Sequence, residues 1–390
     1  MKSIRHAVTA IVLTLLALIS AAAGFVVLSV ARRVVTPEKR GTDTQILAVD
    51  TGAQTIELTR TLDTELPGRY GLFTTGTHGY VKLGAVLSAD TTRVRRKLLT
   101  QIDPGARIDP AAAFSGWYYS SPRELHLRWD NVLIGSPSGP CPAWLFPAAA
   151  GAPASDTWVI QIHGRGGNRA ECLRAVPVFH SLGMTNLVVS YRNDGEAPRT
   201  RGGAYALGAS EWRDVDSAIS YALRHGARCV LLMGWSMGGA IALQTAVSSG
   251  QRSAIIGLVL ESPVVDWRSV LRFQAREQGV RDPLPELAMT ILSSPVTARW
   301  GGAEEAIPFD RLDMLARAEE LDVPILILHS DDDGFVPADA SHALAEARSD
   351  IVTMPHFAGA RHAKLWNYDQ TGWTRAITDW AAAQGFSASA

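Results

Sequence analysis

The chain contains little cysteine and has almost no net charge. Only Cys141, Cys172 and Cys229 are present among 390 residues, too few and too scattered for a disulfide framework or a zinc site. A single Cys141–Cys172 bridge is left open, since an oxidising compartment would allow it. Lysine and arginine number 37 against 38 aspartates and glutamates, so no overall field attracts nucleic acid.

Motifs for nucleotides and metals are also missing. Neither a P-loop nor an H-E-x-x-H sequence occurs anywhere in the chain. The stretch HGRGGNR fails as a dinucleotide fingerprint, because G-x-G-x-x-G requires glycine where Arg169 stands. We therefore expect no cofactor, no metal and no nucleic-acid partner.

One long uncharged run stands at the start of the chain, over residues 7–30. As a helix it would extend about 36 Å, enough to cross a hydrocarbon core of about 30 Å with some tilt. The alternative is a cleaved signal peptide, with Lys2 and Arg5 as its basic region and the alanines at 21–23 near a cleavage site. The apolar run continues beyond those alanines, which favours a retained single-pass anchor in the lipid bilayer.

The charges that flank this run do not set its orientation. Lys2 and Arg5 precede the run, and four basic residues follow it: Arg32, Arg33, Lys39 and Arg40. Long domains cross membranes largely regardless of such charges. We predict a membrane protein with residues 1–40 as anchor and flanks. The flanking charges allow an extracytoplasmic catalytic domain, and this is the location that we expect.

Residues 41–128 predict a small β-rich unit with antiparallel strands, because short apolar stretches alternate with glycine and threonine. We find no chemistry in this unit: His78 and His126 lack companions that would complete a metal site. Its basic run, TTRVRRKLL at residues 91–99, is predicted to form a solvent-facing strand surface.

From residue 129 to 390, apolar strands alternate with amphipathic helices, which predicts an α/β domain with a mostly parallel sheet covered on both faces. Residues 227–247 are apolar enough to resemble a second membrane span. Glycine and serine at their centre instead predict a buried strand, a turn and a buried helix.

That turn carries the sequence GWSMG, residues 234–238, in which Ser236 stands between two glycines. A serine that projects from so tight a turn leaves no room for side chains at Gly234 and Gly238. Such a serine adopts an unfavourable backbone conformation. Its hydroxyl lies at the positive end of the following helix, where developing negative charge is stabilised.

The motif matches the nucleophile elbow of α/β-hydrolases, in which the catalytic acid and then the histidine follow the serine in the chain. HSDDDGFVP, residues 329–337, resembles the family's acid loop, although Ser330 replaces its usual glycine. This resemblance assigns the acid to Asp333 among three successive aspartates. GARH resembles the loop of the base and assigns it to His362, with His356 as a weaker candidate. We interpret His329 and His342 as structural or surface residues.

IHGRGGNR, residues 162–169, resembles the family's oxyanion loop, which implies that the backbone N–H groups of Arg165 and Met237 form the oxyanion hole. The resemblance covers about residues 129–385. Two further stretches, SYRNDGEAP and EWRDVDSAISYALRHGA, look like membrane-anchored bacterial α/β-hydrolases, and the resemblance leans toward the serine aminopeptidase and prolyl-oligopeptidase-like branch. In this fold the insertion at about 267–321 implies a short helical lid.

The residues predict a serine hydrolase that cleaves a carboxylic ester, thioester or amide of a small acyl or peptide substrate. Ser236 would form an acyl-enzyme, with His362 as the base and Asp333 as its orienting acid. An acyltransferase with the same triad is an alternative that nothing in the chain separates from hydrolysis. A third hypothesis is a catalytically silent, membrane-tethered binding protein, which would need none of the three side chains.

Overall fold

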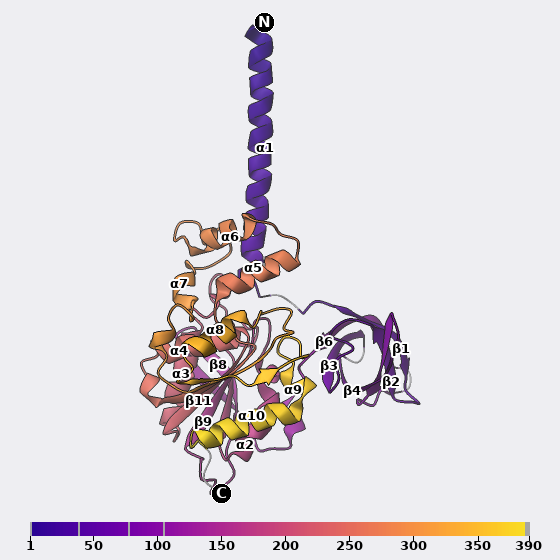
Figure 1. Cartoon of the computed structure of the whole chain (residues 1–390), viewed down its shortest axis with the longest axis vertical. Coiled ribbons are helices and arrows are strands. Elements are labelled where there is room, and N and C mark those ends of the chain that lie inside the picture. Colours follow the sequence, from indigo (N-terminus) through magenta and orange to yellow (C-terminus); the bar gives the residue numbers. More distant parts are fainter. Residues whose placement is uncertain (1, 38–39, 77–78, 104–105, 387–390) are drawn as a thin grey trace.

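A computed structural model describes residues 2–37, 40–76, 79–103 and 106–386 of the chain; Lys39 and His78 lie outside this part. The described chain forms three parts: a long N-terminal helix, a small β-barrel and a large sheet with helices on both faces (Figure 1). The long helix meets the body of the protein at helices that belong to the 267–321 insertion (Figure 1).

The N-terminal helix is α1, Lys2–Val35. Its segment Thr9–Val35 is long and apolar enough to cross a membrane, by length and composition alone, as a signal sequence would also be. Three residues spaced four apart, Val27, Ala31 and Val35, are buried. This spacing places them on one face of the helix, and that face packs against the insertion.

The β-rich unit predicted for the region before the main domain is confirmed, and it closes into a barrel of strand order β1-β2-β5-β4-β3-β6. Closure leaves no unpaired strand edge, which removes the usual site of aggregation. Its strands are β1 (Thr44–Asp50), β2 (Thr55–Thr59), β3 (Tyr70–Gly76), β4 (Tyr80–Ala89), β5 (Arg93–Leu98) and β6 (Ile108–Ser115). Apolar side chains, among them Leu58, Leu72 and Leu83, fill the interior.

The prediction of a solvent-facing basic strand is wrong for one residue of β5. Arg93 and Lys97 are exposed, but Arg96 is fully buried. Alternation along a strand directs Arg96 to the barrel interior, on the same side as its neighbours two residues away. There its guanidinium donates hydrogen bonds of 2.7–3.0 Å to four backbone carbonyls, of Thr64, Leu66, Gly68 and Gly84. The strand pattern did not reveal this role because the acceptors come from other segments.

The main domain contains the predicted mostly parallel sheet, with strand order β14-β13-β12-β11-β9-β10-β8-β7, and β15 also pairs with β13. Only β7 and β8 run antiparallel to their neighbours. The strands are β7 (Asp130–Ser136), β8 (Gly139–Phe146), β9 (Thr157–Ile162), β10 (Thr185–Val189), β11 (Cys229–Trp235), β12 (Ile255–Glu261), β13 (Ile325–Ser330), β14 (Val352–Thr353) and β15 (His356–Phe357).

Helices cover both faces of this sheet and form two separate apolar clusters. The first cluster includes α3 (Trp212–Arg224), α4 (Met237–Ser248), α8 (Asp339–Ala347) and the insertion; the second includes α2 (Val176–Ser181), α9 (Leu365–Tyr368) and α10 (Gln370–Ala383). Short 3-10 helices occur at Pro122–Leu125, Arg169–Arg174 and Arg252–Ala254.

The predicted strand, turn and helix at 227–247 are observed as β11 and α4. All three cysteines are free, so Cys141 and Cys172 form no bridge.

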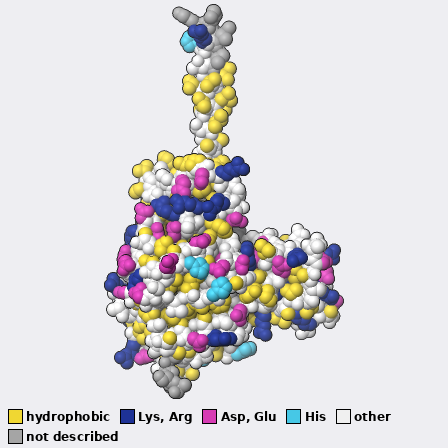
Figure 2. All heavy atoms as spheres, viewed as in Figure 1, with side chains coloured by type: hydrophobic (Ala, Val, Ile, Leu, Met, Phe, Trp, Pro, Cys, Tyr) yellow, Lys and Arg dark blue, Asp and Glu magenta, His cyan; other side chains and the backbone are white. Residues whose placement is uncertain are grey.

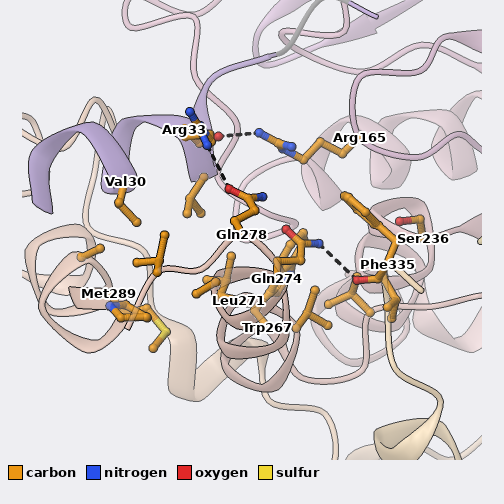
Figure 3. Close-up of a pocket in the computed structure, with 18 residues that line it drawn as sticks. Val30, Arg33, Arg165, Ser236, Trp267, Leu271, Gln274, Gln278, Met289 and Phe335 are labelled. Carbon is orange, nitrogen blue, oxygen red and sulfur yellow. Dashed lines mark hydrogen bonds between the residues drawn. The ribbon is translucent and has the colours of Figure 1, made fainter. Parts of the chain in front are cut away.

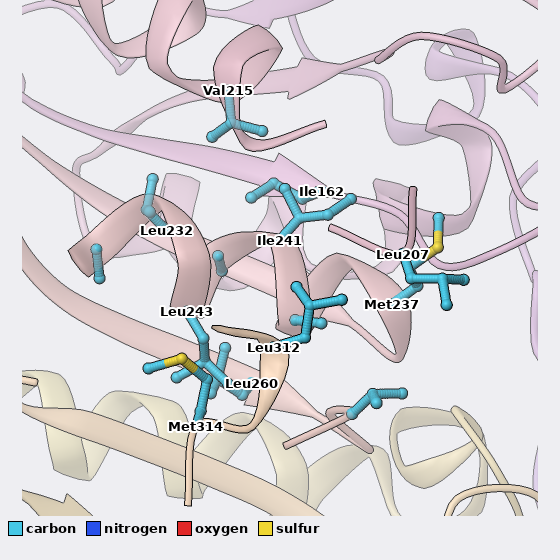
Figure 4. Packing of buried hydrophobic residues seen from close by; sticks show 14 of the residues in the cluster. Ile162, Leu207, Val215, Leu232, Met237, Ile241, Leu243, Leu260, Leu312 and Met314 are labelled. Carbon is cyan, nitrogen blue, oxygen red and sulfur yellow. The ribbon is translucent and has the colours of Figure 1, made fainter. Parts of the chain in front are cut away.

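The insertion consists of α5 (Trp267–Glu277), α6 (Leu284–Ser293), α7 (Phe309–Leu312) and a 3-10 turn at Ala318–Glu320. Its first part lies beside the lower end of α1 (Figure 1). Its last part is anchored on the sheet: Leu312 and Met314 belong to the same buried cluster as Leu243 of α4 and Leu260 of β12 (Figure 4). The insertion therefore connects α1 to α4, the helix that follows Ser236.

We predict that Arg96→Met destabilises the barrel by at least about 3 kcal/mol, because four buried carbonyls lose their donor. Hydrogen exchange of the β2 and β5 amides, recorded as a function of urea concentration, measures the free energy of unfolding of the barrel separately from that of the main domain. The control, Lys97→Met on the exposed face of the same strand, should change the free energy of unfolding by less than about 0.5 kcal/mol. Equal stability of the two variants would contradict this role of Arg96.

Candidate active site

Ser236 occupies the turn between β11 and α4 with φ 53° and ψ −117°, a left-handed conformation that a serine rarely adopts. Strain of this kind costs about 1–3 kcal/mol and persists only where surrounding packing enforces it. A Cβ atom at Gly234 would lie 2.3 Å from the carbonyl oxygen of Gly238. A Cβ atom at Gly238 would lie 2.2 Å from the carbonyl oxygen of Ile162. No side chain fits at either glycine.

The structure brings Ser236, His362 and Asp333 together in one hydrogen-bonded chain. His362 Nε2 lies 2.9 Å from Ser236 Oγ, and His362 Nδ1 lies 2.8 Å from Asp333 Oδ2. Since a carboxylate only accepts, Nδ1 carries a proton and Nε2 of the neutral ring faces the serine hydroxyl as an acceptor. This arrangement allows the imidazole to remove the serine proton.

Asp333 is buried and held in place by several donors. Its Oδ1 accepts hydrogen bonds of 2.9 Å from the backbone N–H groups of Phe335 and Val336. Burial raises the pKa of Asp333, but His362 and then His329 outweigh burial and hold it well below its usual range. Asp333 is therefore ionised at neutral pH beside the imidazole.

The other candidates for acid and base lie away from Ser236. Asp331 pairs with His342 at 2.7 Å and with the exposed His356 at 3.5 Å. Asp332 accepts a hydrogen bond of 2.7 Å from the backbone N–H of Gly359. None of these side chains is brought to the serine.

His329 is buried beside the acid, where it supports the loop. Its Nε2 lies 3.0 Å from the Val336 carbonyl oxygen and 3.3 Å from Asp333 Oδ2. Its Nδ1 lies 2.8 Å from the hydroxyl of Ser341. Both ring nitrogens are thus engaged in fixing the acid loop.

Both residues predicted for the oxyanion hole lie near Ser236. Met237 is the first residue of α4, where a backbone N–H has no acceptor within the helix. Arg165 follows the end of β9 and borders the same two cavities as Ser236. A Cβ atom built on Gly164 would lie 3.3 Å from the Cβ of Ser236, so this loop passes directly beside the serine.

Side chains whose role the sequence alone does not reveal fix the loop after β9. Glu171 accepts a hydrogen bond of 2.7 Å from the Gly164 N–H, and the Tyr191 hydroxyl donates to the carbonyls of His163 and Gly164. Burial lowers the pKa of His163, but Asp194 outweighs burial and raises it. Asp194 lies in SYRNDGEAP, directly after β10, where the carboxyl ends of parallel strands meet. In the sequence, only this position after a strand pointed to a role for Asp194 at the site.

Two cavities meet at Ser236. One, of about 110 Å³, is mostly apolar and lies between α1, α5 and α6 (Figure 3). The other, of about 430 Å³, is polar and lies between the main domain and the barrel; Trp117, Arg361 and Lys364 border it. The barrel residue Asp63 also borders this cavity, so the β-rich unit contributes to the site although its sequence indicated no chemistry. Ser236 therefore borders both an apolar and a polar cavity.

The model of the alpha/beta hydrolase family matches residues 159–377, more than half of the chain. The chain belongs to the α/β-hydrolase family. A second model, a domain of unknown function (DUF8805), matches residues 45–115 and coincides with the barrel of this α/β-hydrolase. No curated protein sequence matches the chain.

Solved structures of esterases share the α/β-hydrolase fold with this chain. An esterase of Pyrococcus furiosus, Pf2001, has a TM-score of 0.52 at 15% identity, covering 68% of this chain and 93% of its own. Est1E of Butyrivibrio proteoclasticus has a TM-score of 0.50 at 18% identity, covering 65% of this chain and 98% of its own. These likenesses to solved structures concern the fold alone, and the family itself is shown by the family model.

We predict that Gly238→Ala lowers the free energy of unfolding by about 1–3 kcal/mol, because the added methyl group overlaps the Ile162 carbonyl. Thermal unfolding of the full chain measures the change. Gly250→Ala is the matched control, since a Cβ atom there meets nothing within 4 Å. If both alanines are tolerated equally, the close approach of α4 to β9 is not as described.

Proposed function

We propose that the protein is a serine hydrolase that cleaves carboxylic esters through an acyl-enzyme on Ser236. The observation that carries this proposal is the continuous hydrogen-bonded chain from Ser236 through His362 to Asp333. These residues are far apart in the sequence, and the serine is held in a strained conformation at the first turn of a helix. A chain of this geometry activates an alcohol that is otherwise a poor nucleophile.

The first half of the reaction forms the acyl-enzyme. His362 Nε2 accepts the proton of Ser236 as Oγ bonds to the ester carbonyl carbon, and the carbonyl oxygen becomes negative. The N–H groups of Arg165 and Met237 stabilise that oxygen, which contributes several kcal/mol, about 2.7–4 for one such donor. The tetrahedral intermediate then expels the alcohol, which takes the proton from His362.

The second half releases the acid. A water molecule gives a proton to His362 and attacks the acyl carbonyl, and Ser236 leaves with that proton restored. Asp333 stays ionised throughout and stabilises the imidazolium that forms in each half. The polar cavity beside Ser236 gives water a route to the acyl group, which favours hydrolysis over acyl transfer.

The apolar cavity favours an ester with an acyl chain over an amide of a peptide. A binding protein without activity would have no use for a strained serine, which costs stability. The intact geometry therefore supports a catalytic role.

We predict that Ser236→Ala abolishes both labelling by a fluorophosphonate probe and turnover of p-nitrophenyl acetate. Asp333→Asn should lower kcat about 10⁴-fold, because the imidazole then presents the wrong tautomer to the serine. Both quantities are measured on the purified full-length chain.

The matched controls are Asp331→Asn and His356→Ala, which change neighbouring groups that do not contact Ser236. Both should retain turnover within about threefold of the parent. Labelling that survives in Ser236→Ala, or activity that depends on His356 and not on His362, would overturn the assignment.

We further propose that α1 is retained as a single-pass anchor and that the catalytic domain is extracytoplasmic. The helix runs without a break past the alanines at 21–23. Beyond them Val27, Ala31 and Val35 are buried in the body, and the Val35 carbonyl accepts a hydrogen bond of 2.8 Å from Tyr205 N–H. This helix end is thus part of the enzyme itself.

We predict that the mature protein stays in the membrane fraction after carbonate extraction with its N-terminal residues intact by mass spectrometry. Protease added to intact cells, with the outer membrane permeabilised where one exists, should digest the catalytic domain. A soluble mature chain that starts near Gly24 would contradict anchor retention, and protection from protease would contradict the orientation.

A further inference from the structure

The anchor helix forms one wall of the apolar cavity that leads to Ser236. Val30 and Val34 of α1 border this cavity, opposite Leu271 of α5 and Met289 of α6 (Figure 3). The cavity therefore exists only while the end of α1 and the insertion are packed together. A soluble esterase needs no membrane helix in its acyl pocket.

Polar contacts connect the end of α1 to both the insertion and the predicted oxyanion loop. Arg33 Nη1 donates to Gln278 Oε1 at 2.9 Å (Figure 3). Arg165 Nη2 donates to the carbonyl oxygens of Arg33 at 2.6 Å and Thr36 at 3.0 Å. The last carbonyls of a helix lack partners within it, and a guanidinium satisfies them well. The helix end is thus fixed beside the serine.

The exposed part of α1 has the length of a bilayer core. Residues 9–26 would extend about 27 Å as a helix, close to the hydrocarbon thickness of about 30 Å of a typical membrane. Large apolar side chains of this part, among them Leu13, Ile19 and Phe25, are exposed, and burial begins at Val27. Val30 lies only about 6 Å beyond Val26 along the helix axis. No spacer therefore separates the membrane surface from the mouth of the cavity.

The insertion exposes apolar side chains close to the part of α1 where the helix enters the body of the protein. Leu287, Val296 and Trp300 are 45%, 76% and 60% exposed. The Trp300 carbonyl accepts a hydrogen bond of 3.2 Å from Arg32 Nε, which places this segment against α1. Figure 2 shows hydrophobic side chains gathered on the body around the foot of the helix. Tryptophan is enriched at membrane interfaces, where one end of its ring system is apolar and the other is hydrated.

We propose that the substrate is a long-chain fatty acyl ester dissolved in the bilayer, which passes along α1 directly into the apolar cavity. This inference rests on the proposed esterase function. The carbons next to the ester would fill the apolar cavity between α1, α5 and α6, and the rest of the acyl chain would extend along α1 towards the bilayer. The ester carbonyl would lie at Ser236 and the alcohol part in the polar cavity beside the barrel. Hydrolysis consumes one water and yields a fatty acid and the free alcohol. The membrane anchor is then a part of the substrate site as well as a tether.

The route is tested with the full chain reconstituted in phosphatidylcholine vesicles and 4-methylumbelliferyl oleate as the probe. The ester is placed either in the vesicles that hold the enzyme or in separate vesicles added afterwards. We expect hydrolysis at least about tenfold faster when enzyme and ester share a bilayer, since a long acyl chain leaves a membrane reluctantly. Equal rates in the two arrangements would overturn the proposal.

The wall is tested by Val30→Trp and Val34→Trp, which place a large side chain in the cavity. Each should lower the ratio of kcat/KM for the oleate ester to kcat/KM for the acetate ester at least about tenfold, since the long acyl chain loses its pocket and acetate needs little of it. Val26→Trp, at an exposed position one turn earlier, is the matched control and should change neither value.

Loss of both activities to the same degree, or of neither, in both cavity variants would overturn the inference. Turnover of the acetate ester shows that each variant is folded and active. Failure of the esterase proposal is distinguishable, because acetate turnover would then be absent in the parent or unaffected by Ser236→Ala.

Discussion

The candidate site depends on one close contact, in which the first turn of α4 crosses the end of β9. Gly238 lies so near the carbonyl oxygens of Ile162 and His163 that any side chain would collide with them. This contact forces Ser236 into its left-handed conformation and places the loop of Arg165 beside it. A single packing constraint thus positions the proposed nucleophile and the proposed oxyanion loop, and two neighbouring parallel strands, β11 and β9, supply them.

The histidine loop is held by a second buried network, based on Glu261 at the end of β12. Its carboxylate accepts hydrogen bonds from the indole N–H groups of Trp235 and Trp373, and from the backbone N–H of Leu365. Burial raises the pKa of Glu261, against the effect of Arg174 and these donors. Leu365 follows His362 by three residues, so this network fixes the proposed base relative to the strand that carries Ser236.

The sequence predicted those features that depend on local pattern. Apolar strands separated by amphipathic helices revealed the α/β sheet, and GWSMG located Ser236 because tight turns impose glycine at fixed positions. Features that depend on distant segments were not visible. The burial of Arg96 depends on carbonyls contributed by other parts of the barrel, and the supporting roles of Glu171, Tyr191 and Glu261 appear only when the strands are side by side. The cavity wall formed by α1 is of the same kind, since more than 200 residues separate that helix from α5 in the chain.

The most direct test is a structure of the full chain after reaction with a long-chain alkyl phosphonate. We predict phosphorus bonded to Ser236 Oγ, an oxygen within hydrogen-bonding distance of the backbone nitrogens of Arg165 and Met237, and the alkyl chain between α1 and α5. An adduct on another residue, or a phosphonate oxygen directed away from both nitrogens, would show that Ser236 and this oxyanion hole do not form the active site.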